Sequence, residues 1–380
     1  MRGLFCGCLI VLLAAAGCAV LDGAKDRGHG HGHGHAHDHD HGHGHSHADG
    51  HGHGPHGHSH GPHGHSHTAP EVAETDGHRR LPPPSQSEDA AQNAARQAVA
   101  DALIDHDFRR ALAAAEPWTG AGRFDAWILM AVSDAHLELG QLDAAEDALQ
   151  RVLDVKPTAP AYFRASYLLH LRGNDEDAAA VLELALDGTP ESARSERAWI
   201  ATELGDLLRF QGEHDAAEDR YRQALDLDPR WSLARVGLAR CARARGELGR
   251  AAALYEQADA TVASLSELSL VQAALSETGA AEASFRAAVA RGRSDDHYNR
   301  MLSHALADHG WATADAVDLA RRELQVRPNA HTYDALAHAL WADGRHAEAL
   351  EASERALSSG IREPELLYHA GLAALGCGER

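Results

Sequence analysis

A pattern of apolar residues and glycines that recurs about every 34 residues constrains the fold of this chain more than any other feature. The glycines that mark it are Gly140, Gly173, Gly212, Gly246, Gly279, Gly310 and Gly344. They place unit starts near residues 92, 126, 159, 198, 232, 265, 296 and 330, with a final half-unit near 364. A unit of this length cannot bury its apolar face alone and must stack on its neighbours. The sequence therefore predicts an all-α array of helical hairpins over residues 92–380.

The composition agrees with closely packed helices and argues against one class of partner. Aromatic residues make up only 5% of the chain, and the repeats are rich in alanine and leucine, which favour helices. The 56 acidic residues outnumber the 35 basic ones, which gives a formal net charge of −21. Nucleic acids are bound by basic surfaces, so we expect no nucleic-acid partner.

Small residues recur at fixed places within each unit. In the unit from Ala198, Gly205 allows close helix approach, Gly212 lies at the turn, Ala217 is a small contact point and Pro229 ends the unit. The pattern resembles the tetratricopeptide-repeat family, in which each unit is a pair of antiparallel helices and the units form a right-handed solenoid. The resemblance covers about three quarters of the chain. No phosphate loop, nucleophile elbow or zinc-protease motif is present in the sequence, so we expect no enzyme.

Two units depart from the regular pattern. The unit from Leu265 is short and rich in serine, and Ala283 is displaced from the expected alanine position. The spacing before Ala198 is 39 residues, which predicts extra residues around 191–197 that lengthen the start of the next helix. The single helix expected after residue 364 would cover the last apolar face of the array.

The resemblance implies that the first helix of each unit lines a concave groove. Aromatic rings and a central pair, Arg240 and Arg243, favour an extended peptide with an acidic group, because arginine makes bidentate contacts with carboxylates. The alternative is that several of the rings belong to the core between helices. The predicted groove residues are Trp127, Phe163, Tyr167, His170, Trp199, Asp206, Arg209, Arg240, Arg243, His304, Asp334, His338 and Trp341.

One group of groove residues allows a sharper hypothesis. His304 and His338 occupy the same position in adjacent units, and Asp334 lies one turn before His338. Together with His297 and His331 they form a candidate metal site, although solvated groove histidines are the more common outcome for such a pattern.

The first residues predict a targeting signal rather than part of a folded domain. Residues 4–16 are apolar, too short for the about 20 residues of a membrane span but suited to a signal peptide. The stretch ends in Ala15-Ala16-Gly17-Cys18, which resembles the lipobox of bacterial lipoproteins, although that family usually has leucine where this chain has Ala15. The resemblance implies that residues 1–17 are removed and that Cys18 is lipidated at the start of a linker, residues 18–28. An ordinary secretory signal, with Cys18 incidental, is the alternative.

The same resemblance predicts a location. Ala19, rather than aspartate, follows the cysteine, which favours an outer-membrane anchor facing the periplasm of a bacterial envelope. Of the other cysteines, Cys241 and Cys377 lie in expected helices far apart in the chain. We therefore predict two buried thiols and no disulfide framework.

Eighteen of the 30 histidines lie within residues 29–67, where they alternate with small and polar residues. No residue in this tract is bulky and apolar, so it is expected to be disordered, and imidazoles without thiolates favour zinc, nickel, copper or cobalt. The alternatives are a repeat expansion without function and a pH-responsive segment. The predicted ligands are His29, His31, His33, His35, His37, His39, His41, His43, His45, His47, His51, His53, His56, His58, His60, His63, His65 and His67.

Residues 68–91 form a Pro- and Ser-rich linker between the tract and the repeats. The sequence as a whole predicts a lipid-anchored repeat scaffold that binds a protein or peptide, with a metal-collecting tether. Two other functions fit the same features. One is metal storage or delivery as the main task, and the other is assembly of an envelope complex with a passive histidine tract.

Overall fold

The computed structural model describes residues 90–120, 124–155 and 157–378, and these residues are helical without any strand. The first helices of the units are α2 (Ala90–Ile104), α4 (Ala126–Glu138), α6 (Ala159–Leu171), α8 (Arg194–Phe210), α10 (Ser232–Ala244), α12 (Val262–Ala274), α14 (Asn299–Asp308) and α16 (Ala330–Ala342). The second helices are α3 (Phe108–Ala115), α5 (Leu142–Leu153), α7 (Asp175–Gly188), α9 (His214–Leu227), α11 (Leu248–Glu256), α13 (Thr278–Gly292), α15 (Thr313–Val326) and α17 (His346–Leu357). Helix α18 (Pro364–Gly376) follows alone.

The helix order confirms the predicted array of hairpins. Helices α4, α6, α10 and α16 begin at the predicted unit starts, residues 126, 159, 232 and 330. Helix α8 has 17 residues and begins at Arg194, which confirms that the extra residues before Ala198 lengthen its start. Short 3-10 turns at Glu116–Trp118 and Asp296–Tyr298 complete the described elements.

The turn inside each hairpin explains the recurring glycines. Gly140 adopts a positive φ of 72°, and the N–H of the next residue, Gln141, bonds to the carbonyl of His136 at 2.8 Å. This Schellman-type ending satisfies carbonyls that the helix end leaves without partners, and glycine adopts its left-handed backbone without steric cost. The same geometry recurs at the other turn glycines of the array, Gly173, Gly212, Gly246, Gly310 and Gly344.

The sixth hairpin corrects the sequence alignment. Its left-handed turn residue is Ser276, with φ 65°, whereas Gly279 lies inside α13. With Ser276 as the turn, Ala281 stands five residues after it, as Ala145 stands after Gly140. The predicted displacement of Ala283 was therefore wrong, because the glycine nearest to the turn was taken for the turn residue.

A small residue on most of the first helices holds the two helices of a hairpin close together. This residue lies seven positions before the turn, and where it is serine its hydroxyl donates to an alanine carbonyl of the second helix at 2.8–2.9 Å. The serines are Ser133, Ser166, Ser269 and Ser303. In the fourth unit the same position is Gly205, and a Cβ there would lie 2.7 Å from Cε1 of Tyr221. The Tyr221 ring therefore fills the space that serine occupies elsewhere.

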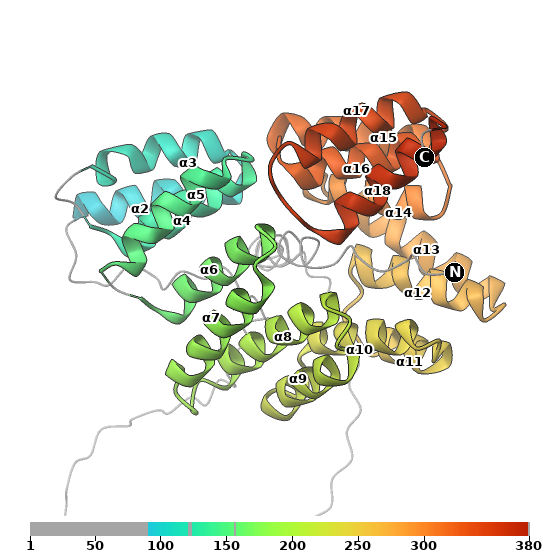
Figure 1. Cartoon of the computed structure of the whole chain (residues 1–380), viewed down its shortest axis with the longest axis horizontal. Helices are drawn as coiled ribbons and strands as arrows, with labels where there is room; N and C mark the ends of the chain where they lie inside the picture. The colour runs from blue at the N-terminus through green and yellow to red at the C-terminus, as the bar shows by residue number, and fades with distance from the viewer. Residues whose placement is uncertain (1–89, 121–123, 156, 379–380) are drawn as a thin grey trace, which may run out of the picture.

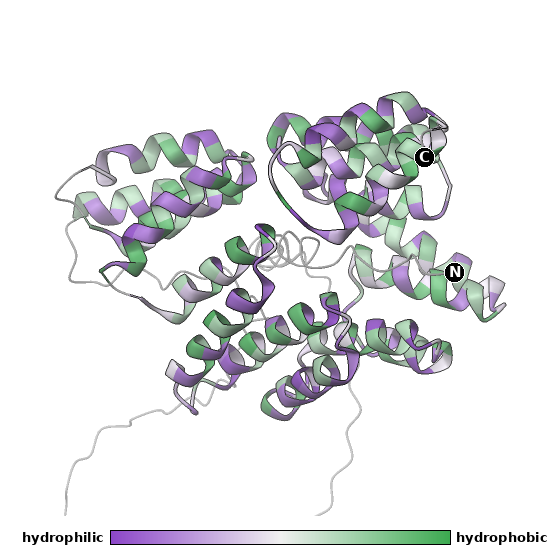
Figure 2. Ribbon diagram, viewed as in Figure 1, coloured by the Kyte–Doolittle hydropathy of each residue, from purple (hydrophilic) through white to green (hydrophobic). Residues whose placement is uncertain are grey.

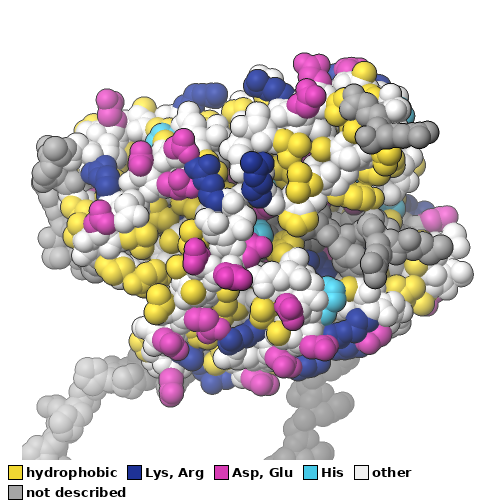
Figure 3. Space-filling model, viewed as in Figure 1, with side chains coloured by type: hydrophobic (Ala, Val, Ile, Leu, Met, Phe, Trp, Pro, Cys, Tyr) yellow, Lys and Arg dark blue, Asp and Glu magenta, His cyan; other side chains and the backbone are white. Residues whose placement is uncertain are grey.

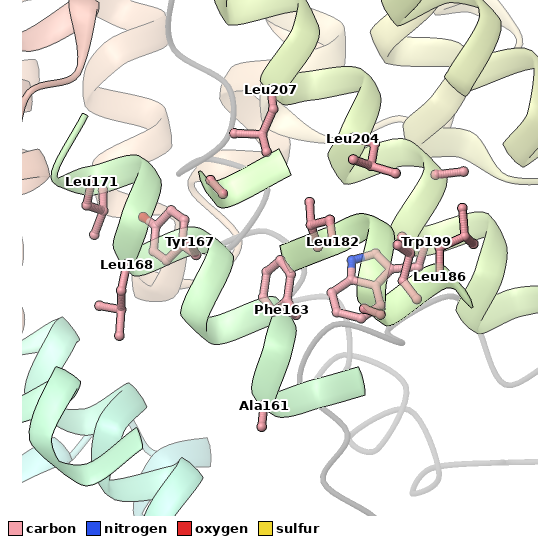
Figure 4. Close-up of a cluster of buried hydrophobic side chains, with 14 of the residues drawn as sticks. Ala161, Phe163, Tyr167, Leu168, Leu171, Leu182, Leu186, Trp199, Leu204 and Leu207 are labelled. Atoms are coloured by element: carbon pink, nitrogen blue, oxygen red, sulfur yellow. The ribbon is translucent and has the colours of Figure 1, made fainter. Parts of the chain in front are cut away.

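Alanine and leucine build most of the core between successive hairpins. Figure 2 shows apolar and polar stretches alternating along the helices. The largest core cluster runs from α4 to α10 and includes Leu182 and Leu204, both nearly inaccessible to solvent (Figure 4). It also contains Ala330, Ala356, Ile361 and Leu366. This packing of small residues is the physical reason for the low aromatic content.

The array curls so far that units distant in the sequence touch. In Figure 1 the helices form an arc, with first helices such as α6, α8 and α16 towards the inside and second helices such as α7, α9 and α17 towards the outside. The backbone N–H of Arg362, just before α18, donates to the carbonyl of Leu171 at the end of α6 at 2.9 Å. The Asn329 side chain, just before α16, donates to the carbonyl of Glu138 in α4 at 3.3 Å. Repeat solenoids usually contact only adjacent units, so this closure is additional to the repeat pattern.

A buried ion network stabilises the closure. The Arg327 side chain is 1% exposed and lies 2.7 Å from Glu323 of α15 and 3.4 Å from Glu138 of α4. The turn of the second unit also packs closely against the segment before α16. A Cβ on Gly140 would lie only 2.9 Å from the carbonyl oxygen of Pro328. We call the contacts of residues 327–330 and 362 with α4 and α6 the closure contact.

The single helix α18 covers the last hairpin with one face. Ala373 is buried in the same core cluster as residues of α16 and α17, Leu366 is buried in the largest core cluster, and Leu367 and Leu375 are 51% and 66% exposed. Cys241 is buried as predicted, and burial raises the pKa of its thiol to about 11. Cys377 is exposed, so its predicted burial was wrong, because it lies just beyond the end of α18.

Several sequence predictions concern residues outside the described part of the chain. The signal peptide, Cys18, the histidine tract and most of the linker all lie before residue 90. None of the described helices combines the length and the apolar character that crossing a membrane requires. On the face in Figure 3, acidic and basic side chains are interspersed, with hydrophobic side chains grouped between them.

Candidate functional site: the inner face of the solenoid

The structure places the predicted groove residues on the first helices of six different units, and most of their side chains are out of contact with solvent. Four are partly exposed, namely Trp127, Arg243, His304 and Trp341. Nine are buried, namely Phe163, Tyr167, His170, Trp199, Asp206, Arg209, Arg240, Asp334 and His338. The inner face is therefore built chiefly from side chains that contact one another.

The aromatic residues of α6 and α8 belong to the core. Phe163 packs edge-on against Trp199 with ring centroids 4.4 Å apart, and the indole N–H of Trp199 donates to Glu203 at 3.1 Å. Tyr167 is 7% exposed and lies in the same hydrophobic cluster (Figure 4). The sequence left open whether these rings line a groove or fill the core, and the structure favours the core for all three.

Asp206 and Arg209 form a buried polar network with Tyr221. The Tyr221 hydroxyl donates to Asp206 at 2.8 Å, and the Arg209 guanidinium donates to the same oxygen at 2.9 Å. Burial and the nearby Asp206 charge raise the pKa of Tyr221 well above its usual value, so the hydroxyl stays a donor. The sequence did not identify Tyr221 as a partner of Asp206 and Arg209. A tyrosine at this repeat position predicts packing of the ring and gives no sign that its hydroxyl has a polar role.

The predicted arginine pair already has a carboxylate partner within the chain. Arg240 of α10 contacts Glu267 of α12 at 2.7 Å, and Arg243 lies 3.6 Å from the other oxygen of Glu267. Burial alone would raise the pKa of Glu267, but the two arginines and the Tyr255 hydroxyl hold it well below its usual range. Glu267 therefore occupies the place that the sequence assigned to an acidic group of a bound peptide.

Histidines from helices α14, α16 and α18 gather at the C-terminal end of the inner face. His338 of α16 stacks on His369 of α18 with ring centroids 4.3 Å apart, and His304 of α14 lies 5.7 Å from His338. Asp334 of α16 accepts a hydrogen bond from Nδ1 of His369 at 2.8 Å. Asp334, Glu365 and His369 each bring one ligand atom within 4.8 Å of the others. We call His304, Asp334, His338, Glu365 and His369 the histidine–carboxylate cluster.

The protonation states within this cluster differ for physical reasons. Burial and the neighbouring His338 lower the pKa of His304 to about 3, and burial with His369 lowers that of His338. Burial also acts to lower the pKa of His369, but the charge and hydrogen bond of Asp334 outweigh it and raise the pKa. Burial and the adjacent carboxylates raise the pKa of Glu365. Near pH 7, His304 and His338 are therefore neutral imidazoles, the form that ligates metals.

The sequence identified only part of this cluster. It grouped His304, Asp334 and His338 correctly, but His331 instead contacts Glu363 at 2.8 Å. His297 packs against His106, with ring centroids 3.9 Å apart. His369 and Glu365 were missed because they lie on the unpaired α18, where the repeat register is hardest to assign.

Comparisons with known proteins agree with this geometry. Models of the tetratricopeptide repeat match residues 133–193, 202–264 and 329–362. The fold is a tetratricopeptide-repeat solenoid. Yeast Tom70 is similar in structure, with a TM-score of 0.50 and 13% identity over 80% of this chain and 68% of that one. A search of curated proteins finds no match.

Two further solved structures have a lower similarity. A chain of the APC/C hetero-tetramer Cut9-Hcn1 has a TM-score of 0.45 and 15% identity over 77% of this chain and 58% of its own. PilW, a type IV pilus biogenesis factor, has a TM-score of 0.47 and 18% identity over 57% of this chain and all of its own. Stacked tetratricopeptide repeats present extended concave surfaces to other proteins, so the described part of the chain is a scaffold of this kind.

Proposed function

We propose that this chain is a membrane-anchored tetratricopeptide-repeat scaffold that binds a protein or peptide partner in the bacterial envelope. The observation that supports it best is the continuous inner face of the solenoid, to which successive first helices contribute (Figure 1). Because Glu267 already neutralises Arg240 and Arg243, recognition of the partner does not depend on an acidic group at that point. Trp127 and Trp341, partly exposed at the two ends of the inner face, provide apolar contacts for it.

The inner face is tested by removing one of these rings. Replacing Trp341 with alanine in the full chain is expected to lower partner capture at least about tenfold, since buried aromatic anchors dominate binding energy. Quantitative cross-linking and mass spectrometry measure which proteins are captured from the native envelope. The matched control is Trp311→Ala, because Trp311 is 48% exposed and contacts Phe285 of α13 instead of the inner face. Equal capture by both variants and the parent chain would contradict the proposal.

The proposal assigns separate tasks to the N-terminal segments. Lipidated Cys18 anchors the chain to a membrane, and the histidine tract collects zinc, nickel, copper or cobalt on the tether between membrane and solenoid. Two acyl chains on one cysteine support stable anchoring, whereas a single chain is marginal. The eighteen tract histidines also favour a second candidate function, in which metal storage or delivery is the main task and the repeats only dock the protein.

The metal chemistry of the tract predicts a strong pH dependence. Isothermal titration of the full chain with Zn²⁺ at pH 7.5 is expected to show about four or five ions more than a chain with the tract deleted, at about four imidazoles each. At pH 5 the binding is expected to be largely lost, because free imidazole has a pKa of about 6.5 and its protonated form cannot ligate. A chain with the tract deleted is the control. Flat heats for the full chain at both values of pH would refute the prediction.

A further inference from the structure

We propose that the histidine–carboxylate cluster is a binding site for one divalent transition-metal ion of the zinc class, built into the solenoid itself. The donors are Asp334 of α16 and Glu365 and His369 of α18, with the imidazole of His338 completing a four-coordinate set. This site lies in the repeats, so it is independent of the histidine tract and of any ions that the tract collects.

The geometry brings the donors together from two helices. One ligand atom from each of Asp334, Glu365 and His369 lies within 4.8 Å of the other two. Zinc binds nitrogen and oxygen ligands at about 2.0–2.2 Å, so ligand atoms on one ion are separated by up to about 4 Å. Glu365 lies in the first turn of α18 and is only half-buried, so we expect its side chain to move towards the other donors when an ion binds.

Two buried atoms in the cluster point to a missing ligand. Among the residues that the structure describes, neither Asp334 Oδ1 nor His338 Nδ1 has a hydrogen-bond partner, although both residues are 7% exposed or less. Buried polar atoms without partners are rare in native proteins because leaving them so is costly. Nor does any arginine, lysine or histidine of the described residues form an ion pair with Glu365, which faces Asp334. A bound cation accounts for all three observations.

The donor types select the class of metal. Two imidazoles and two carboxylates suit zinc, cobalt or nickel, whereas calcium and magnesium prefer oxygen ligands only. The cluster contains no thiolate, which argues against copper(I). The hydrogen bond between His369 Nδ1 and Asp334 also holds these two donors side by side.

The test uses the full chain with all eighteen tract histidines replaced by asparagine, which removes the tract ligands but keeps its length. Cobalt(II) is the probe, because its visible absorption reports coordination by the protein. We expect one Co²⁺ per chain, displaced by Zn²⁺, and an increase in Tm of roughly 5 °C with excess Zn²⁺, since the ion binds only the folded state. No absorption and no shift in Tm would overturn the proposal.

Single substitutions locate the ion. In the same background, Glu365→Gln and His369→Gln are each expected to weaken Co²⁺ binding at least about tenfold. The control is His136→Gln, because His136 lies on α4 and contacts Gln141 instead of the cluster. Circular dichroism checks that each variant is folded, and Glu365→Gln removes a charge without changing size. Unchanged binding in both folded variants would also overturn the assignment. Loss of tract binding in the titration above leaves this result unaffected, so the two proposals fail separately.

Discussion

Replacing Arg327 with alanine is expected to lower the free energy of unfolding by about 3–5 kcal/mol, because it removes a buried guanidinium that pairs with two buried carboxylates. Arg327 is 1% exposed, donates to Glu323 at 2.7 Å and lies 3.4 Å from Glu138 across the closure contact. The guanidinium also lies over the Phe108 ring of α3, with its carbon 5.7 Å from the centroid. Unfolding by the denaturant guanidinium chloride, followed by circular dichroism, measures the change in the free energy of unfolding.

A second arginine of the same region provides the control. Arg321 on α15 faces Glu348 at 3.4 Å, but both side chains are about half exposed, at 46% and 50%. Arg321→Ala is therefore expected to cost less than about 1 kcal/mol, as exposed ion pairs do. A loss below about 1 kcal/mol for Arg327→Ala would show that the closure contact adds no stability to the array.

The closure contact also shows what the repeat pattern could not predict. The period, the small residues and the turn glycines describe contacts within a unit and between neighbours, and the structure confirms them from α4 to α17 except at the turn of the sixth unit. Whether the superhelix curls enough to bring Asn329 to Glu138 depends on small rotations added over six units. A local sequence pattern does not encode the total of these rotations.

The turn of the sixth unit shows a different limit. A left-handed backbone favours glycine but does not require it, and Ser276 adopts this conformation with φ 65° while Gly279 stands three residues away. Aligning on glycine alone therefore shifted the register of that unit. The carbonyl of Gln272, which accepts from Glu277 at 2.9 Å, identifies the turn correctly in the structure.

The sequence predicted which residues lie on the inner face but not which side chains they contact. The repeat register placed Asp206, Arg240 and His338 on the first helices, as observed. It could not show that Glu267 from the next unit would neutralise Arg240, or that Trp199 would be 1% exposed. Pairing across units depends on side-chain length and helix spacing, which periodicity does not encode.

Tyr221→Ala is expected to destabilise the fold by about 3–5 kcal/mol, the usual cost of deleting a buried aromatic ring. The Tyr221 ring is completely buried between two first helices, where a Cβ on Gly205 or Gly237 would lie 2.7 Å or 2.3 Å from its Cε1. Glycine at both positions shows that the helices are spaced for this ring. Its removal leaves a cavity that the rigid hairpins cannot close, and thermal and guanidinium unfolding measure the loss.

Tyr221→Phe separates the ring from its hydroxyl. This variant keeps the packing against Gly205 and Gly237 but removes the hydroxyl that donates to Asp206 at 2.8 Å, so the expected cost is only about 1 kcal/mol. Arg209 still donates to the same carboxylate at 2.9 Å and keeps it satisfied. A phenylalanine variant as unstable as the alanine variant would mean that the polar network, rather than the glycine-lined ring, stabilises the junction of the fourth and fifth units.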